Sequence, residues 1–217
     1  MTSERLPLFP LQTVLLPGMA LPLHIFEPRY RQMMERVLAA DRRFGVLLIR
    51  EGREVGPDAQ CVEVGTVAEI TDVVPLENGM MNIATTGSRR FRVIAFHHDQ
   101  PYLTGDVEYL SEQYTTSQQL LELQAEVERL TFDYVTTMLI LRDEQATHVQ
   151  LPKDPVTLSY KVAGLLVAIH PFEAQELLAS PTLEHRLLAE ILILHRELAI
   201  LRRMGEMADQ GGRFSLN

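Results

Sequence analysis

Hydrophobic and polar residues alternate along much of the first half of the chain, which is typical of β-strands. Between residues 62 and 71 apolar side chains recur at every second position, so one side of this segment is expected to face a core and the other to face water. The same period of two runs through residues 103–109. Residues 44–49 are almost entirely apolar, which favours a strand buried on both faces, and residues 91–96 indicate a further strand.

One early helix and one tight turn interrupt these strands. Pro28 suits the first turn of a helix, and apolar side chains then recur at helical spacing until Asp41. Asn78-Gly79 lies between two apolar pairs and is a typical hairpin turn. Many short strands with a single early helix predict an open barrel or pseudobarrel.

The second half of the chain changes to a helical period. Thr116 with Gln119 forms a capping-box pattern, and Asp154 before Pro155 marks a second helix start. In the last helix, apolar residues between 183 and 201 keep spacings of three and four, which makes one stripe for packing against other helices. We therefore expect an α+β chain in which a barrel is followed by an α-helical bundle.

The change of period near residues 111–116 is the expected domain boundary. It divides the chain into a barrel over residues 1–112, a helical bundle over residues 113–208 and a flexible tail over residues 209–217. The apolar stripe of the last helix is widened by Leu188, Leu192 and Ile193. A homodimer through this second face is therefore one of the partnerships we expect.

The charge and the cysteine content narrow the classes of partner and compartment. The 217 residues include 20 basic and 29 acidic side chains, a formal net charge of −9. Nucleic-acid binding is disfavoured, because it usually needs a basic face that neutralises phosphates. The single cysteine, Cys61, excludes a disulfide within the chain and favours a reducing compartment. The longest strongly apolar stretch, residues 187–194, is far shorter than the ~20 residues that span a membrane. We expect a cytoplasmic protein that does not enter membranes.

The sequence contains none of the motifs that would mark a reaction centre. There is no phosphate-binding loop, no G-x-S-x-G nucleophile elbow and no H-E-x-x-H zinc helix. The seven histidines are scattered, and structural roles are favoured for each. We therefore predict that the chain is not an enzyme and has no catalytic residue, cofactor or metal.

Two arginine clusters, Arg42-Arg43 and Arg89-Arg90 with Arg92, have two interpretations. The favoured one is that these side chains face solvent and balance nearby acidic residues. The alternative is a small patch that binds an anion or an RNA backbone on the edge of the barrel. No series of exposed aromatic residues accompanies the arginines, although stacking on such residues supports single-strand binding.

Methionines gather at two places in the first half of the chain. Met33-Met34 belong to the early helix, and Leu76, Met80 and Met81 surround the Asn78-Gly79 turn. The favoured interpretation is that these side chains cap the barrel core. The functional interpretation is a flexible apolar edge that receives extended or unfolded peptide, because methionine is common at adaptable binding surfaces.

The order of several motifs resembles one known family, the N-terminal substrate-binding domain of Lon proteases. The motifs that carry the resemblance are LPLFPL at 6–11, VLLPG at 14–18, LPLHIFEPRY at 21–30, VGTVAEI at 64–70, Gly87 with RFRV at 90–93, and PYL at 101–103 with Val107-Glu108. The match covers residues 5–110, and the helical part is similar mainly in its leucine period. Lon proteases continue into ATPase and peptidase domains, which this sequence lacks, so we expect a stand-alone form.

The resemblance implies a PUA-like β-pseudobarrel and a role in binding protein substrates or partners. We expect a non-catalytic module for unfolded or degron-bearing polypeptide, or for a protease or chaperone partner, with an adaptor or regulator role in proteolysis or protein quality control. An RNA-binding PUA-like module is the alternative. A third is an unrecognised enzyme or small-ligand protein, which a deep pocket lined by polar groups would favour. The expected peptide-binding residues are Phe26, Glu27, Arg29, Tyr30, Met33, Met34, Leu76, Met80 and Met81.

Overall fold

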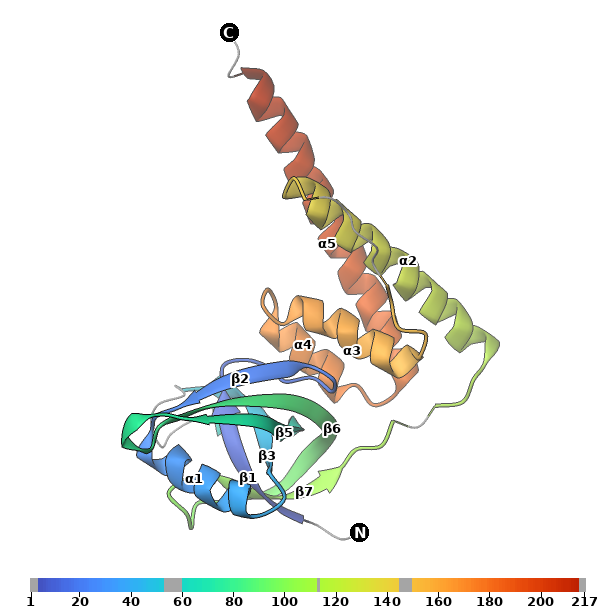
Figure 1. The fold of residues 1–217 in the computed structure, drawn as a ribbon. Coiled ribbons are helices and arrows are strands. Elements are labelled where there is room, and N and C mark those ends of the chain that lie inside the picture. Colours follow the sequence, from blue (N-terminus) through green and yellow to red (C-terminus); the bar gives the residue numbers. More distant parts are fainter. Residues whose placement is uncertain (1–3, 53–59, 113, 145–149, 215–217) are drawn as a thin grey trace. The chain divides into compact units, whose positions relative to one another are not determined.

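The structure, a computed structural model, describes residues 4–52, 60–112, 114–144 and 150–214, with side chains up to residue 207. Within this part the chain divides into two compact units. Unit 1 comprises Met1–Glu112 with Ala163–Ala179, and unit 2 comprises Gln113–Val162 with Ser180–Asn217. Figure 1 shows the helices and strands of both units and labels most of them.

The described strands of unit 1 form one sheet that curls into an open barrel. They are β1 (Glu4–Leu11), β2 (Ala20–Ile25), β3 (Arg43–Glu51), β4 (Gln60–Cys61), β5 (Val64–Pro75), β6 (Met81–His97) and β7 (Thr104–Tyr109). The order β1-β7-β6-β5-β3 closes into a ring because β1 also pairs in parallel with β3. The strand β4 extends the sheet from β3, and β2 pairs with β6. The predicted α+β class with a pseudobarrel is confirmed.

The predicted early helix, α1 (Pro28–Ala39), packs its apolar face into the barrel core. Pro28 occupies the first turn, as expected. The helix buries Tyr30, Met33, Met34 and Val37, which are spaced three and four residues apart. Their partners in the core come from several strands. The helix therefore closes one side of the barrel with the same spacing that predicted it.

The strand β1 was not assigned from the sequence, because Pro7 and Pro10 interrupt it. The first half of β1 pairs with β7, as in Leu6↔Gly105. Its second half pairs with β3, as in Leu8↔Gly45. The strand β1 thus pairs with two different strands along its length.

The turn predicted at Asn78-Gly79 joins β5 to β6. It is a short 3-10 segment, η1 (Glu77–Gly79), in which Asn78 and Gly79 have φ angles of 58° and 72°. Both residue types tolerate this left-handed region. Leu76 N–H donates to Met80 O at 2.8 Å and closes the loop. The hairpin is confirmed, with a longer loop than two residues.

In the described part of the chain, four helices come after the strands: α2 (Gln118–Leu141), α3 (Pro155–Leu166), α4 (Pro171–Ala179) and α5 (Leu183–Phe214). The cap of α2 is Ser117, whose hydroxyl accepts from Leu120 N–H at 3.1 Å, rather than the predicted Thr116. Asp154 caps α3 as predicted, because its carboxylate accepts from Thr157 N–H at 2.8 Å.

Residues 163–179, which the sequence placed in the bundle, group with the barrel in unit 1. Gln175 of α4 donates its amide N–H to Val64 O of β5 at 2.9 Å. A leucine period predicts a helix but does not tell which core the helix covers. At the other end, α5 runs through residues 209–214 of the expected tail, while residues 215–217 lie outside the described part, so the flexibility of the tail stays a prediction.

Candidate functional site

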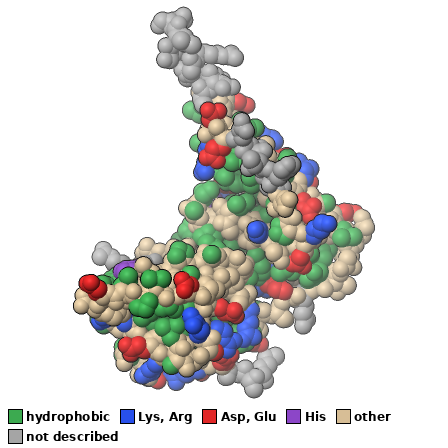
Figure 2. Space-filling view, viewed as in Figure 1, with side chains coloured by type: hydrophobic (Ala, Val, Ile, Leu, Met, Phe, Trp, Pro, Cys, Tyr) green, Lys and Arg blue, Asp and Glu red, His purple; other side chains and the backbone are tan. Residues whose placement is uncertain are grey.

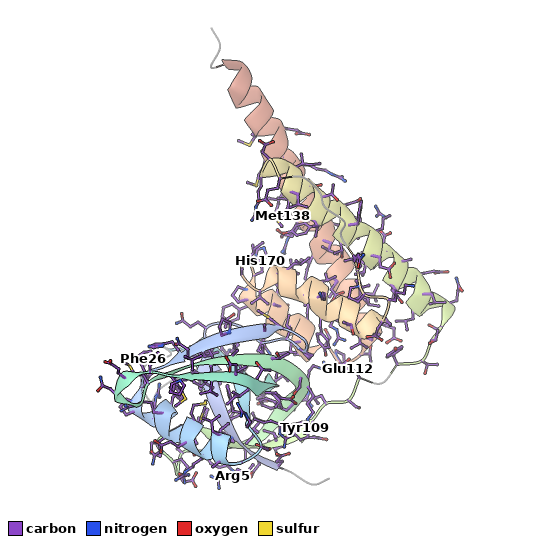
Figure 3. All side chains as sticks on the ribbon, viewed as in Figure 1. Arg5, Phe26, Tyr109, Glu112, Met138 and His170 are labelled. Atoms are coloured by element: carbon purple, nitrogen blue, oxygen red, sulfur yellow. The ribbon has the colours of Figure 1, made fainter. Side chains whose placement is uncertain are left out.

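The residues predicted to bind peptide come from two segments that lie side by side in unit 1. The first segment joins β2 to α1, and the second is the β5–β6 hairpin. Ile25 at the end of β2 pairs with Met81 at the start of β6. Arg31 of α1 donates a side-chain N–H to Asn78 O in the hairpin. Figure 3 shows Phe26 at this hairpin end of unit 1, away from Arg5 and Tyr109.

Alternation along the strands separates these residues into an outer and an inner set. His24, Asn82 and Val74 lie in register across β2, β6 and β5, and all three are exposed. Two residues further along the strands come Phe26, Met80 and Leu76. We define the outer apolar patch as the residues Phe26, Val74, Leu76 and Met80. The exposed fractions are 52% for Phe26, 50% for Val74 and 39% for Leu76.

The outer apolar patch includes a residue that the sequence did not single out. Val74 lies two residues before Leu76 and so on the same face of the strand. This spacing of two is the signal in the sequence that indicates Val74. In Figure 2 hydrophobic side chains gather on unit 1 at the end that carries the hairpin. Contiguous exposed apolar surface is uncommon on proteins that bind nothing, and it marks interaction sites more often than isolated apolar residues do.

The inner set lies beneath the patch and not at the surface. Met33 and Met34 are fully buried in the core, and the Tyr30 ring stacks on Phe9 with centroids 4.0 Å apart. Met81 is half-buried and packs against the same core. For these four residues the core-capping interpretation is the one that the structure supports. They hold the segment that carries Phe26 in place.

A cavity of about 220 Å³ opens next to Phe26. Its walls come from the end of β1, from β2 and from the start of α1, and its lining residues are Phe9, Leu11, Pro22, Leu23, His24, Ile25, Phe26, Glu27 and Tyr30. The lining is mostly apolar. It therefore suits a hydrophobic side chain better than a polar small molecule.

Charges at the rim of the cavity are paired with one another. Glu27 accepts from Arg29 Nε at 2.9 Å, and the Arg29 guanidinium lies 4.4 Å from the centre of the Tyr30 ring. Glu27 and Arg29, which are among the expected peptide-binding residues, thus lie next to each other beside the cavity. Because each neutralises the other, the rim carries little net charge.

The arginine cluster of β6 does not form the surface patch considered from the sequence. Arg90 is buried, in contrast to the expected solvent-facing position. Its Nε lies 2.6 Å from Glu112 Oε1, and its Nη1 donates to Leu178 O at 2.7 Å. Arg89 stacks over the Tyr109 ring at 3.5 Å, and both Arg89 and Arg92 are exposed. The three arginines therefore do not form one continuous surface patch, because Arg90 is withdrawn from it.

A buried polar network lies in the core of unit 2. Ser159 Oγ donates to Glu190 Oε1 at 2.5 Å and accepts from Arg186 Nε at 2.6 Å. Arg186 also donates to the Tyr160 hydroxyl at 3.1 Å. Burial raises the pKa of Glu190 to about 8, against smaller opposing effects of Ser159 and Arg186. The exposed fraction of both Arg186 and Glu190 is 0%, so no substrate reaches this network and we assign it a structural role.

Other chemistry-bearing residues of the described part do not assemble into a centre. In that part of the chain, no three His, Cys, Asp or Glu side chains are grouped so as to hold a metal ion. Burial raises the pKa of Cys61 to about 11, which keeps the thiol protonated and unreactive. None of the helices, over the residues described, is both long and apolar enough to cross a membrane.

These observations define an α+β protein with an open barrel, an exposed apolar patch and an adjoining apolar cavity. The chain belongs to the family of the ATP-dependent protease La (LON) substrate-binding domain, whose model matches residues 5–196. The resemblance read from the sequence is thereby confirmed. The matched family is the substrate-binding domain and not the peptidase domain.

Known proteins similar to the chain agree with this assignment. It is 27% identical over 215 residues to a Lon protease of Syntrophus aciditrophicus (strain SB), covering 95% of this chain and 27% of that protein. It is 29% identical over 189 residues to Lon protease 2 of Syntrophobacter fumaroxidans, covering 84% and 24%. The chain thus spans about a quarter of the length of these relatives.

Among solved structures, a Lon N-terminal domain protein from Xanthomonas campestris is similar, with a TM-score of 0.62 and 26% identity. The likeness covers 88% of this chain and 98% of the other. The N-terminal domain of Mycobacterium avium complex Lon protease has a TM-score of 0.61 at 18% identity, which supports the fold alone.

Proposed function

We propose that this chain binds polypeptide segments that expose apolar side chains, and that it does so without acting on them chemically. The observation that carries the proposal is the outer apolar patch beside the apolar cavity, in a chain of the Lon substrate-binding family. Unfolded or degron-bearing polypeptide is the expected ligand. Delivery of such ligands to a protease or a chaperone, as an adaptor or regulator, is the role that fits.

Apolar burial at the patch is the expected source of affinity. Phe26 stands beside the cavity, and large aromatic side chains dominate many interfaces. Truncating such an anchor typically costs about 1–2 kcal/mol, which corresponds to a roughly tenfold loss of affinity. Because Glu27 and Arg29 neutralise each other, the affinity is expected to change little with salt concentration.

The test is fluorescence anisotropy with a labelled, permanently unfolded protein, such as reduced and carboxymethylated lactalbumin. Phe26→Ala is expected to weaken binding about tenfold. Phe132→Ala is the matched control, because Phe132 of α2 is 51% exposed and Phe26 is 52% exposed. Equal losses of affinity in both variants would show that the binding is non-specific hydrophobic association. No binding by the unaltered chain would refute the proposal.

A further inference from the structure

The strand β2 has one free edge beside the cavity. It pairs with β6 and with no other strand of the described part. The register pairs Ala20 with Thr86, and its extension by one residue places Met19 opposite Gly87, whose N–H donates to Met19 O at 2.9 Å. In an antiparallel pair such bonded positions recur at every second residue. Leu21, Leu23 and Ile25 therefore direct their backbone groups to β6.

The intervening residues of β2 direct their backbone groups away from β6. His24 thus presents its N–H and its C=O at the free edge, and Pro22 presents its C=O there. Proline is tolerated at this position because β6 requires no donor from it. No backbone hydrogen bond of His24 on this side occurs within the described residues. Ala20, at the start of the strand, has the same orientation. Between Pro22 and the end of β2 the edge offers one donor between two acceptors.

The end of β1 forms the other side of the same opening. Leu8 N–H donates to Leu103 O at 2.8 Å, which is the last backbone bond from β1 towards β7. Pro10 lies two residues further on the same side and has no N–H. Beyond Leu8 this side of β1 therefore forms no backbone hydrogen bonds to a neighbouring strand. The cavity, which is lined by Leu11 of β1 and Pro22 of β2, lies in the opening between the two strands. We call this opening the seam.

We propose that an extended polypeptide segment pairs with the free edge of β2 at His24 and inserts one bulky apolar side chain into the seam cavity. The inference rests on the proposed function and names the conformation of the ligand. An extended strand presents donors and acceptors along its edge with the spacing that β2 offers, whereas a helix keeps its own backbone groups paired. The cavity admits a single large side chain and is too small for a folded element.

The protein-side test compares His24→Pro with His24→Ala. Both variants lose the imidazole, which lies 2.7 Å from Asn82 Oδ1 and stacks near Phe26. Only the proline also removes the N–H at the free edge, and it leaves the bonds to β6 in place. The probe is a short fluorescein-labelled peptide in which Leu and Thr alternate around a central Phe. His24→Pro is expected to bind this peptide about tenfold more weakly than His24→Ala.

The ligand-side test uses the unaltered protein and N-methylated forms of the same peptide. Methyl groups on alternate amides block one edge of an extended peptide and leave the other edge intact. Methylation of one edge is expected to abolish binding, and methylation of the other to preserve it. A thermal unfolding curve shows whether His24→Pro folds. If it does not fold, the binding of the methylated peptides to the unaltered protein still tests strand pairing.

The outcomes separate the inference from the proposed function. If the two His24 variants bind alike and both methylated peptides bind, strand pairing is overturned while polypeptide binding stands. If the unaltered chain binds neither the peptide nor the unfolded protein, both fail. A defect in His24→Pro together with sensitivity to one methylated edge supports strand pairing.

Discussion

The buried carboxyl group of Glu190 makes the stability of unit 2 depend on pH. Burial raises its pKa to about 8, from an ordinary value near 4.5 that applies in the unfolded chain. The folded state therefore holds the proton more tightly than the unfolded state does. This contribution to stability is fully present below pH 4.5 and is lost as the pH rises through 8. Between the two values the loss is about 1.4 kcal/mol per pH unit.

Replacing Glu190 by Gln removes the titrating group and keeps an acceptor for Ser159. From pH 5 to pH 7 the unaltered chain is expected to lose about 2–3 kcal/mol relative to Glu190→Gln, and the difference between them is expected to level off above pH 8. Urea unfolding followed by circular dichroism at a series of pH values measures both curves. Each curve is fitted over the transition of unit 2, because the two units need not unfold together.

Glu206→Gln is the matched control for this measurement, because Glu206 is an exposed carboxylate on the same helix, α5. Its free energy of unfolding is expected to follow that of the unaltered chain at every pH. A constant difference between the unaltered chain and Glu190→Gln over the whole range would refute the reasoning. It would mean that the carboxyl group ionises in the folded state as readily as it does in water.

Two further predictions concern the stability of unit 1, and urea unfolding measures both. A Cβ on Gly87 would lie 2.2 Å from Leu16 O. Gly87→Ala is therefore expected to lower the free energy of unfolding by roughly 2–4 kcal/mol. A loss below about 0.5 kcal/mol would show that the backbone moves to accommodate the methyl group. Arg90→Met removes a buried ion pair and a hydrogen bond, so the free energy of unfolding is expected to fall by about 2–3 kcal/mol. Arg92 is exposed, so Arg92→Met is expected to change it by no more than about 0.5 kcal/mol. Equal losses in the two variants would contradict the burial of Arg90.

The parts of the fold that local pattern governs were predictable from the sequence. The alternation in residues 62–71 falls within β5, and the helical spacing after Pro28 corresponds to α1. Where two residues both suit the same local role, the pattern does not choose between them. Ser117 and not Thr116 caps α2, although either hydroxyl has the chemistry to do so.

The parts that depend on distant contacts were not predictable. Arg90 and Phe91 are neighbours on β6, and alternation would place them on opposite faces, one in the core and one in water. Both are buried, because Leu178 of α4 lies against Arg90 although it is 88 residues further along the chain. No local property of the sequence around Arg90 predicts that α4 covers it.

The candidate site was predictable as a location but not residue by residue. The sequence indicated both segments, and the structure brings Phe26 and Leu76 to the surface. Met33 and Met34, in contrast, share the helical spacing of Tyr30 and Val37, and that spacing already assigned them to the buried face of α1. Their adaptability as methionines suggested a binding role, but position on the helix determines what a side chain can reach.

The prolines of β1 and β2 have a physical role in the site. Pro10 and Pro22 lie on opposite sides of the seam, each where its strand has no neighbour to bond. A residue with a free N–H at either position would add a donor to the exposed edge and favour closure of the seam or pairing with another copy. With proline at position 22, the N–H of His24 is the donor of β2 that lies next to the cavity and to Phe26, and the next donor on the same edge is that of Ala20, four residues away. The stretch of β2 that can pair beside the cavity is therefore short, as a site selective for short extended segments requires.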